Sequence, residues 1–504
     1  MRMEWQVGPL GQWDGDGVLF LGFEKEEPLA GFGRWLEAEG DWLRETGALE
    51  DFKGSFQQTA VFYAPADKKT SRVICVGLGK RKDFDGDRLR GALAAGLRRC
   101  RELRLHKPLL PLAALEGIPM EATSALEEAV VGGWLGLYRY DAPRGRDDER
   151  PPQLEQWGIH RETEPEAGMR EAVDRALAVA SGVFLARTVT TAPANEVTPR
   201  FLAEKARETA ERHGFRLQAM DEEAAAEMGM GAFLAVAQGS REPGCFVVME
   251  HAPAGTEEDA PLVFVGKGIT FDTGGISIKP ADKMELMKHD MAGAAAVLGA
   301  MDALGALDVP KRVVGILPCA ENMPGGNAYK PGDVVRSLSG LTIEVISTDA
   351  EGRMVLCDGL AYARRYKPAF LVDVATLTGA CIVALGDRVG GVMGNREDLV
   401  EEVRRIGMEV GDKLWPLPLW DFYFEDLKSD VADFKNVGTR KAGCVIGGMF
   451  LKQFVDDETP WVHLDIAGPA WADKDQPTAV RGATGFGVRT LVEIARRWPA
   501  GGGG

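Results

Sequence analysis

The fold depends on one stretch of the sequence, Val265-Gly-Lys-Gly-Ile-Thr-Phe-Asp272-Thr-Gly-Gly-Ile-Ser-Ile-Lys279-Pro280. Its first residue ends an apolar run typical of a buried strand, and charged side chains then follow on a glycine-spaced turn. Strands that are apolar throughout indicate a sheet covered by helices on both faces, and ligands of such sheets bind outside the carboxyl ends of the strands. The sequence predicts strands of this kind at Pro261 to Val265, Arg312 to Leu317, Thr342 to Ile346, Ala369 to Val374 and Val462 to Ile466.

Three further segments bring polar residues to the same region. Asp290 precedes an Ala- and Gly-rich helix predicted from Ala292 to Ala303. The segment Ile346-Ser-Thr-Asp349-Ala-Glu351-Gly-Arg353 follows a predicted strand, and if its backbone is still extended its three charged residues project into one space. The third segment, Asp373-Val-Ala-Thr-Leu-Thr-Gly-Ala380, has residues that suit backbone contact with a ligand.

Four carboxylates therefore enter what we expect to be one cleft, namely Asp272, Asp290, Asp349 and Glu351. Their mutual repulsion, if uncompensated, would raise their pKa values and destabilise the fold. Two divalent cations would cancel these charges, and carboxylates able to bridge are what a two-metal site requires, with its ions about 4 Å apart.

Three basic residues accompany the carboxylates. Lys267 would have to ligate as a neutral amine, which nearby cations make possible because they lower a lysine pKa. Lys279 and Arg353 are better interpreted as retained positive charges that face a developing oxyanion or a small bound anion.

Each of these residues also has an ordinary structural interpretation. Asp272 lies near Gly274 and Gly275, and a single Asp in such a position is more often an Asx-turn residue than a functional one. Lys267-Gly268 resembles part of a phosphate loop, but the spacing of that motif is absent. The four carboxylates and three basic residues taken together indicate a functional site more specifically than any one of them does alone.

The first 165 residues indicate a separate α/β domain. Short apolar runs such as Val18 to Phe23 alternate there with helical patterns such as Leu89 to Leu103. A polar, proline-containing stretch from Asp141 to Glu166 is typical of a domain boundary. Apolar residues then return at helical spacing from Ala167 to about Thr188, which predicts a connecting helix.

The composition excludes a collagen-like chain, a disordered chain and a disulfide-stabilised scaffold. The chain has 504 residues, of which 45% are hydrophobic, and a formal net charge of -17, which is typical of a soluble globular protein. The acid excess repels phosphate backbones and anionic lipids, so we expect no binding to nucleic acid or membranes. No secretory signal and no apolar run near the roughly 20 residues of a membrane span is present. Seven cysteines without a C-x-x-C pair indicate reduced thiols and a cytoplasmic protein.

Taken together, these segments resemble the leucyl aminopeptidase (cytosol aminopeptidase) family of dinuclear metallopeptidases. The pattern Thr348-Asp-Ala-Glu-Gly-Arg353 is the most specific, and Gly266-Lys-Gly-Ile-Thr-Phe-Asp272 precedes it in the family's order. Val462-His-Leu-Asp-Ile-Ala-Gly468 and Gly482-Ala-Thr-Gly485 are similar to the family's C-terminal segments. The resemblance covers roughly residues 190–497, whereas the N-terminal domain matches in size and α/β character only.

The resemblance implies a role for each site residue. One metal is held by Asp272, Asp349 and Glu351. The second is held by Lys267, Asp272, Asp290 and Glu351, so that Asp272 and Glu351 bridge the two ions. Lys279 and Arg353 are the catalytic side chains, with Arg353 holding a bicarbonate that serves as general base. The pocket for the first side chain of the peptide is lined by Met287, Thr376, Gly379, Ala467 and Ala470.

Two positions depart from the family's pattern. Ser347 stands where the family usually has Asn, and it supplies one hydroxyl rather than an amide. His289, beside Asp290, falls at a position that varies in the family, and we interpret it as a packing residue rather than an extra ligand.

The sequence therefore predicts an α/β protein of two domains. A smaller N-terminal α/β (macro-like) domain covers residues 1–165, a linker helix covers 166–188, the catalytic metallopeptidase domain covers 189–500, and 501–504 form a flexible Gly tail. We expect the larger C-terminal domain to be an α/β/α domain whose central mixed sheet carries the metal site.

The expected function is that of a leucyl-type aminopeptidase, which removes the N-terminal residue, leucine or another, from peptides with a free N-terminus by means of a metal-activated water. Oxygen ligands without Cys or His favour Mn²⁺ or Mg²⁺, whereas the resemblance admits Zn²⁺ and Mn²⁺ equally and also implies a homohexamer.

Two rival hypotheses are a two-metal phosphoesterase and a non-catalytic binding or regulatory relative. Lys267 as a ligand and the absence of metal-binding His argue against the first. The complete set of seven metal and catalytic residues argues against the second.

Overall fold

The computed structural model describes the chain except for residues 1, 10, 11, 13, 46, 67, 69, 70, 142–152 and 499–504. The glycine tail predicted at 501–504 thus lies outside the described residues. The chain divides into two compact units, one of Met1–Ala180 with Lys474–Val480 and one of Ser181–Asp473 with Arg481–Gly504. The division falls inside helix α5 (Ala167–Thr191). The domain limits drawn from the sequence stay predictions, and nothing in the sequence indicated that the loop 474–480 belongs to the first unit.

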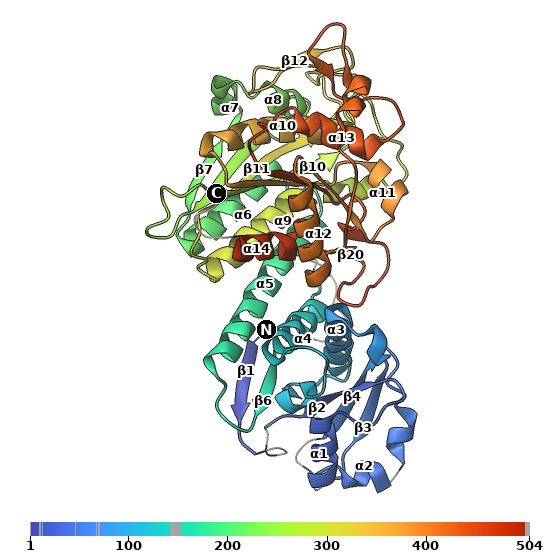
Figure 1. The fold of residues 1–504 in the computed structure, drawn as a ribbon. Coiled ribbons are helices and arrows are strands. Elements are labelled where there is room, and N and C mark those ends of the chain that lie inside the picture. Colours follow the sequence, from blue (N-terminus) through green and yellow to red (C-terminus); the bar gives the residue numbers. More distant parts are fainter. Residues whose placement is uncertain are drawn as a thin grey trace. The chain divides into compact units, whose positions relative to one another are not determined.

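The first unit is built on a mixed six-stranded sheet with the strand order β1-β6-β5-β2-β4-β3, in which only the β3–β4 pair is antiparallel (Figure 1). β2 and β4 are buried along almost their whole length, as continuous apolar runs predict. The elements of this unit are β1 (Arg2–Val7), β2 (Gly17–Phe23), β3 (Thr59–Tyr63), β4 (Arg72–Gly79), β5 (Pro108–Pro111), β6 (Gln156–Arg161), α1 (Ala30–Ala38), α2 (Asp41–Glu45), α3 (Gly86–Glu102) and α4 (Ala122–Leu137).

The second unit has a central mixed sheet between two layers of helices, which confirms the predicted fold class (Figure 1). Its strand order is β16-β15-β18-β14-β9-β11-β8-β7, with β10 paired to β11. The four strands β18, β14, β9 and β11 are parallel neighbours, so their carboxyl ends meet at one edge. The strands of the main sheet are β7 (Arg216–Met220), β8 (Cys245–His251), β9 (Leu262–Gly266), β10 (Gly268–Asp272), β11 (Val313–Asn322), β14 (Phe370–Ala375), β15 (Gly390–Gly394), β16 (Leu414–Pro416) and β18 (Trp461–Asp465).

Helices α10 and α13 lie over one face of this sheet, and α9 and α14 lie over the other (Figure 1). Small residues allow α9 to approach the strands closely, because a Cβ atom at Gly293 would lie 2.1 Å from the carbonyl oxygen of Val374. This contact places the start of α9 beside the ends of β9 and β14. The helices of this unit are α6 (Pro199–His213), α7 (Glu222–Met228), α8 (Gly231–Ala237), α9 (Ala292–Ala306), α10 (Glu351–Ala363), α11 (Gly379–Leu385), α12 (Glu397–Val410), α13 (Gly443–Lys452) and α14 (Val488–Arg497).

One sequence-based expectation about local structure is wrong, and one condition on which another depended is not met. The run Thr342 to Ile346 is not a strand of the main sheet, since β13 (Thr342–Glu344) pairs instead with β12 (Val334–Arg336) and β17 (Phe434–Lys435). The backbone after Asp349 is not extended, because α10 begins at Glu351. A two-stranded sheet of β19 (Trp471–Ala472) and β20 (Gly482–Ala483) completes the unit. Among the described residues, no helix is both long and apolar enough to span a membrane.

Candidate metal and active site

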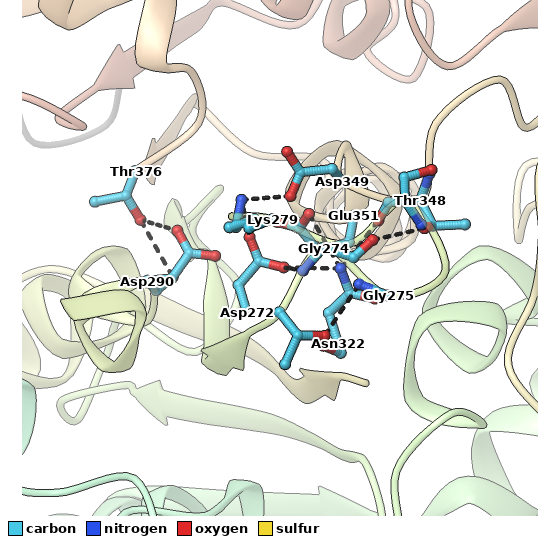
Figure 2. A network of polar contacts seen from close by, with 12 residues as sticks. Asp272, Gly274, Gly275, Lys279, Asp290, Asn322, Thr348, Asp349, Glu351 and Thr376 are labelled. Atoms are coloured by element: carbon cyan, nitrogen blue, oxygen red, sulfur yellow. Dashed lines mark hydrogen bonds and ion pairs between the residues drawn. The ribbon is translucent and has the colours of Figure 1, made fainter. Parts of the chain in front are cut away.

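The site lies at the carboxyl ends of the parallel strands, where the sequence predicted it. Lys267 follows β9, Asp272 ends β10, and Thr376 follows β14. Asp290 stands between a short 3-10 helix (Met284–His289) and the start of α9, as expected. Figure 2 shows the side chains of these segments converging on one space.

Lys267 lies at the centre of the cluster and is almost completely buried. Its Nζ is 2.8 Å from Asp290 Oδ2 and 2.9 Å from Glu351 Oε1, and it donates to the carbonyl oxygen of Thr376 at 2.9 Å. Asp290 is held in turn by Thr376, whose hydroxyl donates to Asp290 Oδ1 at 2.8 Å. One amine thus contacts two carboxylates from different elements.

Lys279 joins the other two carboxylates of the cluster. Its Nζ is 2.8 Å from Asp272 Oδ2 and also forms an ion pair with Asp349 Oδ1. Asp272 Oδ1 accepts the backbone N–H of Gly274 at 2.8 Å, and Gly274 has a φ of 86°, in the left-handed region that favours glycine. Asp349 is the most exposed of the four carboxylates, with 38% of its side chain accessible.

The electrostatics of the cluster are dominated by burial. Burial raises the pKa of Asp272 to about 6, with a further contribution from Glu351, and burial likewise raises the pKa of Asp290 well above its ordinary value. Burial would also raise the pKa of Glu351, but Lys267 and Lys279 outweigh it and lower that pKa. Four carboxyl groups face two ammonium groups, so acidic side chains outnumber basic ones in this cluster.

The donor set of this cluster fits divalent metal ions. One carboxylate oxygen from each of Asp272, Asp290 and Glu351 lies within 4.8 Å of the others, and all three residues are buried. Carboxylate oxygens and one amine are ligands that Mn²⁺ and Zn²⁺ accept, and the surplus negative charge requires compensation. Asp349 is brought to the same group through its contact with Lys279.

Arg353 lies in the first turn of α10 and is buried. One terminal nitrogen of its guanidinium, Nη1, donates to the carbonyl oxygen of Asn436 at 2.6 Å. The Nε of the same guanidinium is buried and has no hydrogen-bond partner among the described residues. Burial lowers its pKa to about 10, although Glu351 and Asp465 oppose this shift. A buried guanidinium with an unused donor is suited to a small anion.

A cavity of about 570 Å³ opens beside the carboxylates. Four residues expected to contact the first side chain of a peptide line it, namely Met287, Thr376, Gly379 and Ala467. Ala470 and Arg353 are buried and are not part of this lining. Trp471, which the sequence did not indicate, contributes an aromatic wall.

The two positions that depart from the family pattern have clear surroundings. His289 packs edge-on against Trp471 with ring centroids 5.6 Å apart, and burial lowers its pKa to about 4. The hydroxyl of Ser347 accepts the backbone N–H of Asp349 at 3.2 Å. Ser347 therefore stabilises the turn that carries a candidate ligand.

Two buried asparagines of the site were missed by sequence reasoning. Asn322 donates to Asp272 and to the loop before α10, and Asn436 accepts the backbone N–H of Ile346 at 2.8 Å and donates to Ser347 O at 2.6 Å. A signal existed for Asn322, since it ends a buried strand at the same sheet edge. Nothing local marks Asn436, which follows the short strand β17 far along the chain.

Gly352→Ala offers a test of the placement of Lys267. A Cβ atom at Gly352 would lie 2.5 Å from Lys267 Cε and 2.6 Å from its Nζ, so we expect the lysine to be displaced and metal binding to be weakened. Overpacking should also lower the free energy of unfolding, by about 1–3 kcal/mol. Gly359→Ala on the same helix is the control, because its Cβ would crowd Val265 at 2.8 Å outside the site. Thermal melts should show that both variants are destabilised, and Mn²⁺ titration should show that only Gly352→Ala binds metal more weakly. Equal metal affinities in the two variants would contradict the placement of Lys267.

Comparison with known proteins gives consistent results along the chain. Residues 184–492 match the model of the cytosol aminopeptidase family, catalytic domain, and residues 21–146 match that family's N-terminal domain. A probable cytosol aminopeptidase of Syntrophobacter fumaroxidans is 56% identical over 500 residues, covering 99% of each chain. One from Nitratidesulfovibrio vulgaris is 49% identical over 501 residues, covering 98% of each.

Solved structures agree with the sequence relatives. A mutant of tomato leucine aminopeptidase has a TM-score of 0.86 and 34% identity, covering 98% of this chain and 96% of its own. The bottromycin maturation enzyme BotP in complex with Mn has a TM-score of 0.84 and 36% identity, covering 95% of this chain and 99% of its own. These likenesses extend to the N-terminal region, where the sequence had offered only size and α/β character.

Proposed function

Because the chain belongs to the cytosol aminopeptidase family, we propose that the carboxylate cluster at the sheet edge is the dinuclear centre of its activity. The family relationship makes the chain a metal-dependent aminopeptidase of the leucyl type that acts on peptides. Neither rival hypothesis, the phosphoesterase or the non-catalytic relative, is supported by these matches.

The single observation that carries the assignment is the convergence of Asp272, Asp290 and Glu351 on one buried space together with Lys267. Asp272 and Glu351 would hold both ions, Asp349 would complete one set, and Lys267 and Asp290 the other. Bound divalent ions would supply a nucleophile from water at neutral pH and polarise the peptide carbonyl. Mn²⁺ or Zn²⁺ suits the donors, and the Mn complex of the related BotP favours Mn²⁺ as the first metal to try.

Two side chains of the site would act on the reacting groups. Lys279 is half-buried beside Asp272 and Asp349, and its ammonium can donate to the oxygen that becomes negative as the peptide carbonyl is attacked. Arg353 would hold a bicarbonate through its unused donor, and that anion would supply a general base. The guanidinium cannot serve as this base itself, because it is protonated at neutral pH.

Recognition of the peptide would use the cavity. Met287, Thr376, Gly379 and Ala467 would contact the first side chain, and Ala470 would support this wall from behind rather than line it. The carboxylates and their ions would receive the free amine of the substrate, which restricts the enzyme to the first residue of a peptide.

The test of this function compares leucyl-amide substrates with and without an N-acetyl group. We expect turnover of the free amine and none of the acetylated compound, because acetylation delocalises the nitrogen lone pair that a metal ion in the site would bind. Met287→Trp, which narrows the cavity, should shift the preference from leucine toward alanine without changing the need for a free amine. Equal hydrolysis of both leucyl compounds would contradict the exopeptidase assignment.

We propose further that the enzyme is a homohexamer in the cytoplasm. Large aromatic side chains are exposed on the surface of the single chain, among them Trp420 with 57% and Phe422 with 61% of its surface accessible. The ring centroids of these two residues lie 5.7 Å apart. Contiguous exposed apolar groups are typical of interfaces. Sedimentation equilibrium should give a mass six times that of the chain, and a monomer would contradict this proposal.

A further inference from the structure

Asn322 lies directly beneath the carboxylate cluster, at the end of β11, and its side chain is completely buried (Figure 2). Its amide nitrogen Nδ2 is 2.8 Å from Asp272 Oδ1 and 3.4 Å from Glu351 Oε2. These are the two carboxylates to which the proposed function gives both ions. The same nitrogen donates to the carbonyl oxygen of Thr348 at 2.9 Å, in the loop that carries Asp349.

The orientation of this amide is fixed by its surroundings. A Cβ atom at Gly275 would lie 2.7 Å from Asn322 Oδ1, so the amide oxygen lies against the backbone of that glycine. The backbone carbonyl of Asn322 accepts both the hydroxyl of Thr273 at 2.7 Å and its N–H at 3.1 Å. If the amide were reversed, its oxygen would face two carboxylates and a carbonyl oxygen, which are all acceptors.

The amide oxygen of Asn322 has no hydrogen-bond partner in the described part of the chain. Leaving a buried acceptor unpaired costs free energy, and an apolar residue of similar shape would avoid this cost. The hydrogen bonds that the amide nitrogen donates must therefore contribute something that offsets the free-energy cost of the unpaired oxygen.

The contacts of Asp272 show what the hydrogen bond from Asn322 contributes. Oδ1 of this carboxylate accepts two N–H groups, from Gly274 and from Asn322, each at 2.8 Å. Two donors fix the plane of the carboxylate, which leaves Oδ2 directed to the side where Lys279 lies, 2.8 Å away. Glu351 Oε2, at the start of α10, makes a longer contact of 3.4 Å with the same amide nitrogen and shares one of the two hydrogens that reach Asp272 and Thr348.

We infer that Asn322 is a positioning residue that orients the two bridging carboxylates together and thereby sets the affinity for the pair of ions. The inference rests on the proposed function, because it presumes that Asp272 and Glu351 both bridge. Hydrogen-bond partners of metal ligands typically change metal affinity by about 10–100-fold when they are removed. A residue that orients two shared ligands should affect both ions at once.

The experiment is calorimetric titration of Mn²⁺ into metal-free protein, with wild type, Asn322→Ala and Asn322→Ser compared. We expect either asparagine variant to lose about 10–100-fold in affinity at both sites. The serine variant keeps a small polar group at this buried position, so it can be measured if Asn322→Ala does not fold. The metal-induced rise in Tm is a second readout, because an ion that binds only the native state stabilises it by an amount that grows with the logarithm of its affinity.

Tyr329→Phe is the matched control. The Tyr329 hydroxyl is buried and donates at 3.0 Å to the carbonyl oxygen of Thr348, the carbonyl that Asn322 also contacts. Among the described residues this hydroxyl donates to no carboxylate of the site, although burial and the nearby charges of Glu351, Asp272 and Asp349 raise its pKa. Wild-type metal affinity in Tyr329→Phe together with a loss in the asparagine variants would support the inference. Wild-type affinity in a folded asparagine variant, or an equal loss in Tyr329→Phe, would overturn it. If the wild type itself bound fewer than two ions, the proposed function would fail instead.

Discussion

Glu351→Ala should abolish aminopeptidase activity and remove both metal ions, because this one carboxylate contacts Lys267 and Asn322 and is expected to be shared between the two ions. Removal of a shared ligand should exceed the effect of losing a hydrogen-bond partner, so we expect metal affinity to fall more than about 100-fold. Asp290→Ala should instead lose one ion and retain the other. Metal analysis after gel filtration measures both stoichiometries.

The control for Glu351→Ala is Glu321→Ala. Glu321 is a mostly buried carboxylate next to Asn322 in sequence, and it accepts the hydroxyl of Ser240 at 2.6 Å instead of facing the site. Its replacement removes the same charge close to the cluster, and two ions per chain should remain bound. Equal metal content in Glu351→Ala and Asp290→Ala would contradict the assignment of Glu351 as the shared ligand.

Arg353→Ala and Lys279→Ala should both lower kcat strongly, but only the first should abolish dependence on bicarbonate. Loss of Lys279 removes a donor to the developing oxyanion, which is worth about 10²–10³-fold in kcat at other acyl-transfer sites. Loss of Arg353 removes the donors that would hold the anion, so added bicarbonate should restore little activity. Both variants should retain their metal ions, as neither side chain is expected to ligate.

The measurement is kcat as a function of bicarbonate concentration in bicarbonate-depleted buffer, for wild type and both variants. Lys279→Ala should keep the wild-type dependence at a lower rate. A wild-type rate that does not respond to bicarbonate would remove the general base from this scheme and leave Arg353 as a structural contact to Asn436.

The sequence predicted the sheet edge and the identity of the clustered residues because both follow from local patterns. Buried parallel strands appear as continuous apolar runs, and the polar residues after them must meet where the strands end, as Lys267 and Thr376 do. The start of α9 beside Asp290 also followed from its small residues. The resemblance then supplied roles that spacing alone could not give.

Other features depend on tertiary contacts that no local pattern encodes. The joint projection of Asp349, Glu351 and Arg353 is conditional on an extended backbone, but α10 begins at Glu351. A short polar segment between a strand and a helix is compatible with either conformation, so its sequence does not decide between them. Arg353 is buried in the first turn of α10 and does not line the cavity that the four carboxylates border. Asn436 follows Arg353 by 83 positions in the sequence, so only the folded chain shows that it belongs to the site.

The most direct test of the dinuclear assignment is the aminopeptidase activity of the chain as a function of bound metal. Protein is stripped with a chelator, Mn²⁺ is returned stepwise, and hydrolysis of leucine p-nitroanilide is measured beside the number of ions bound per chain. We predict no activity in the stripped protein and a rise that reaches its plateau when two ions are bound. Full activity in protein without bound metal, or a plateau reached with a single ion, would contradict the account.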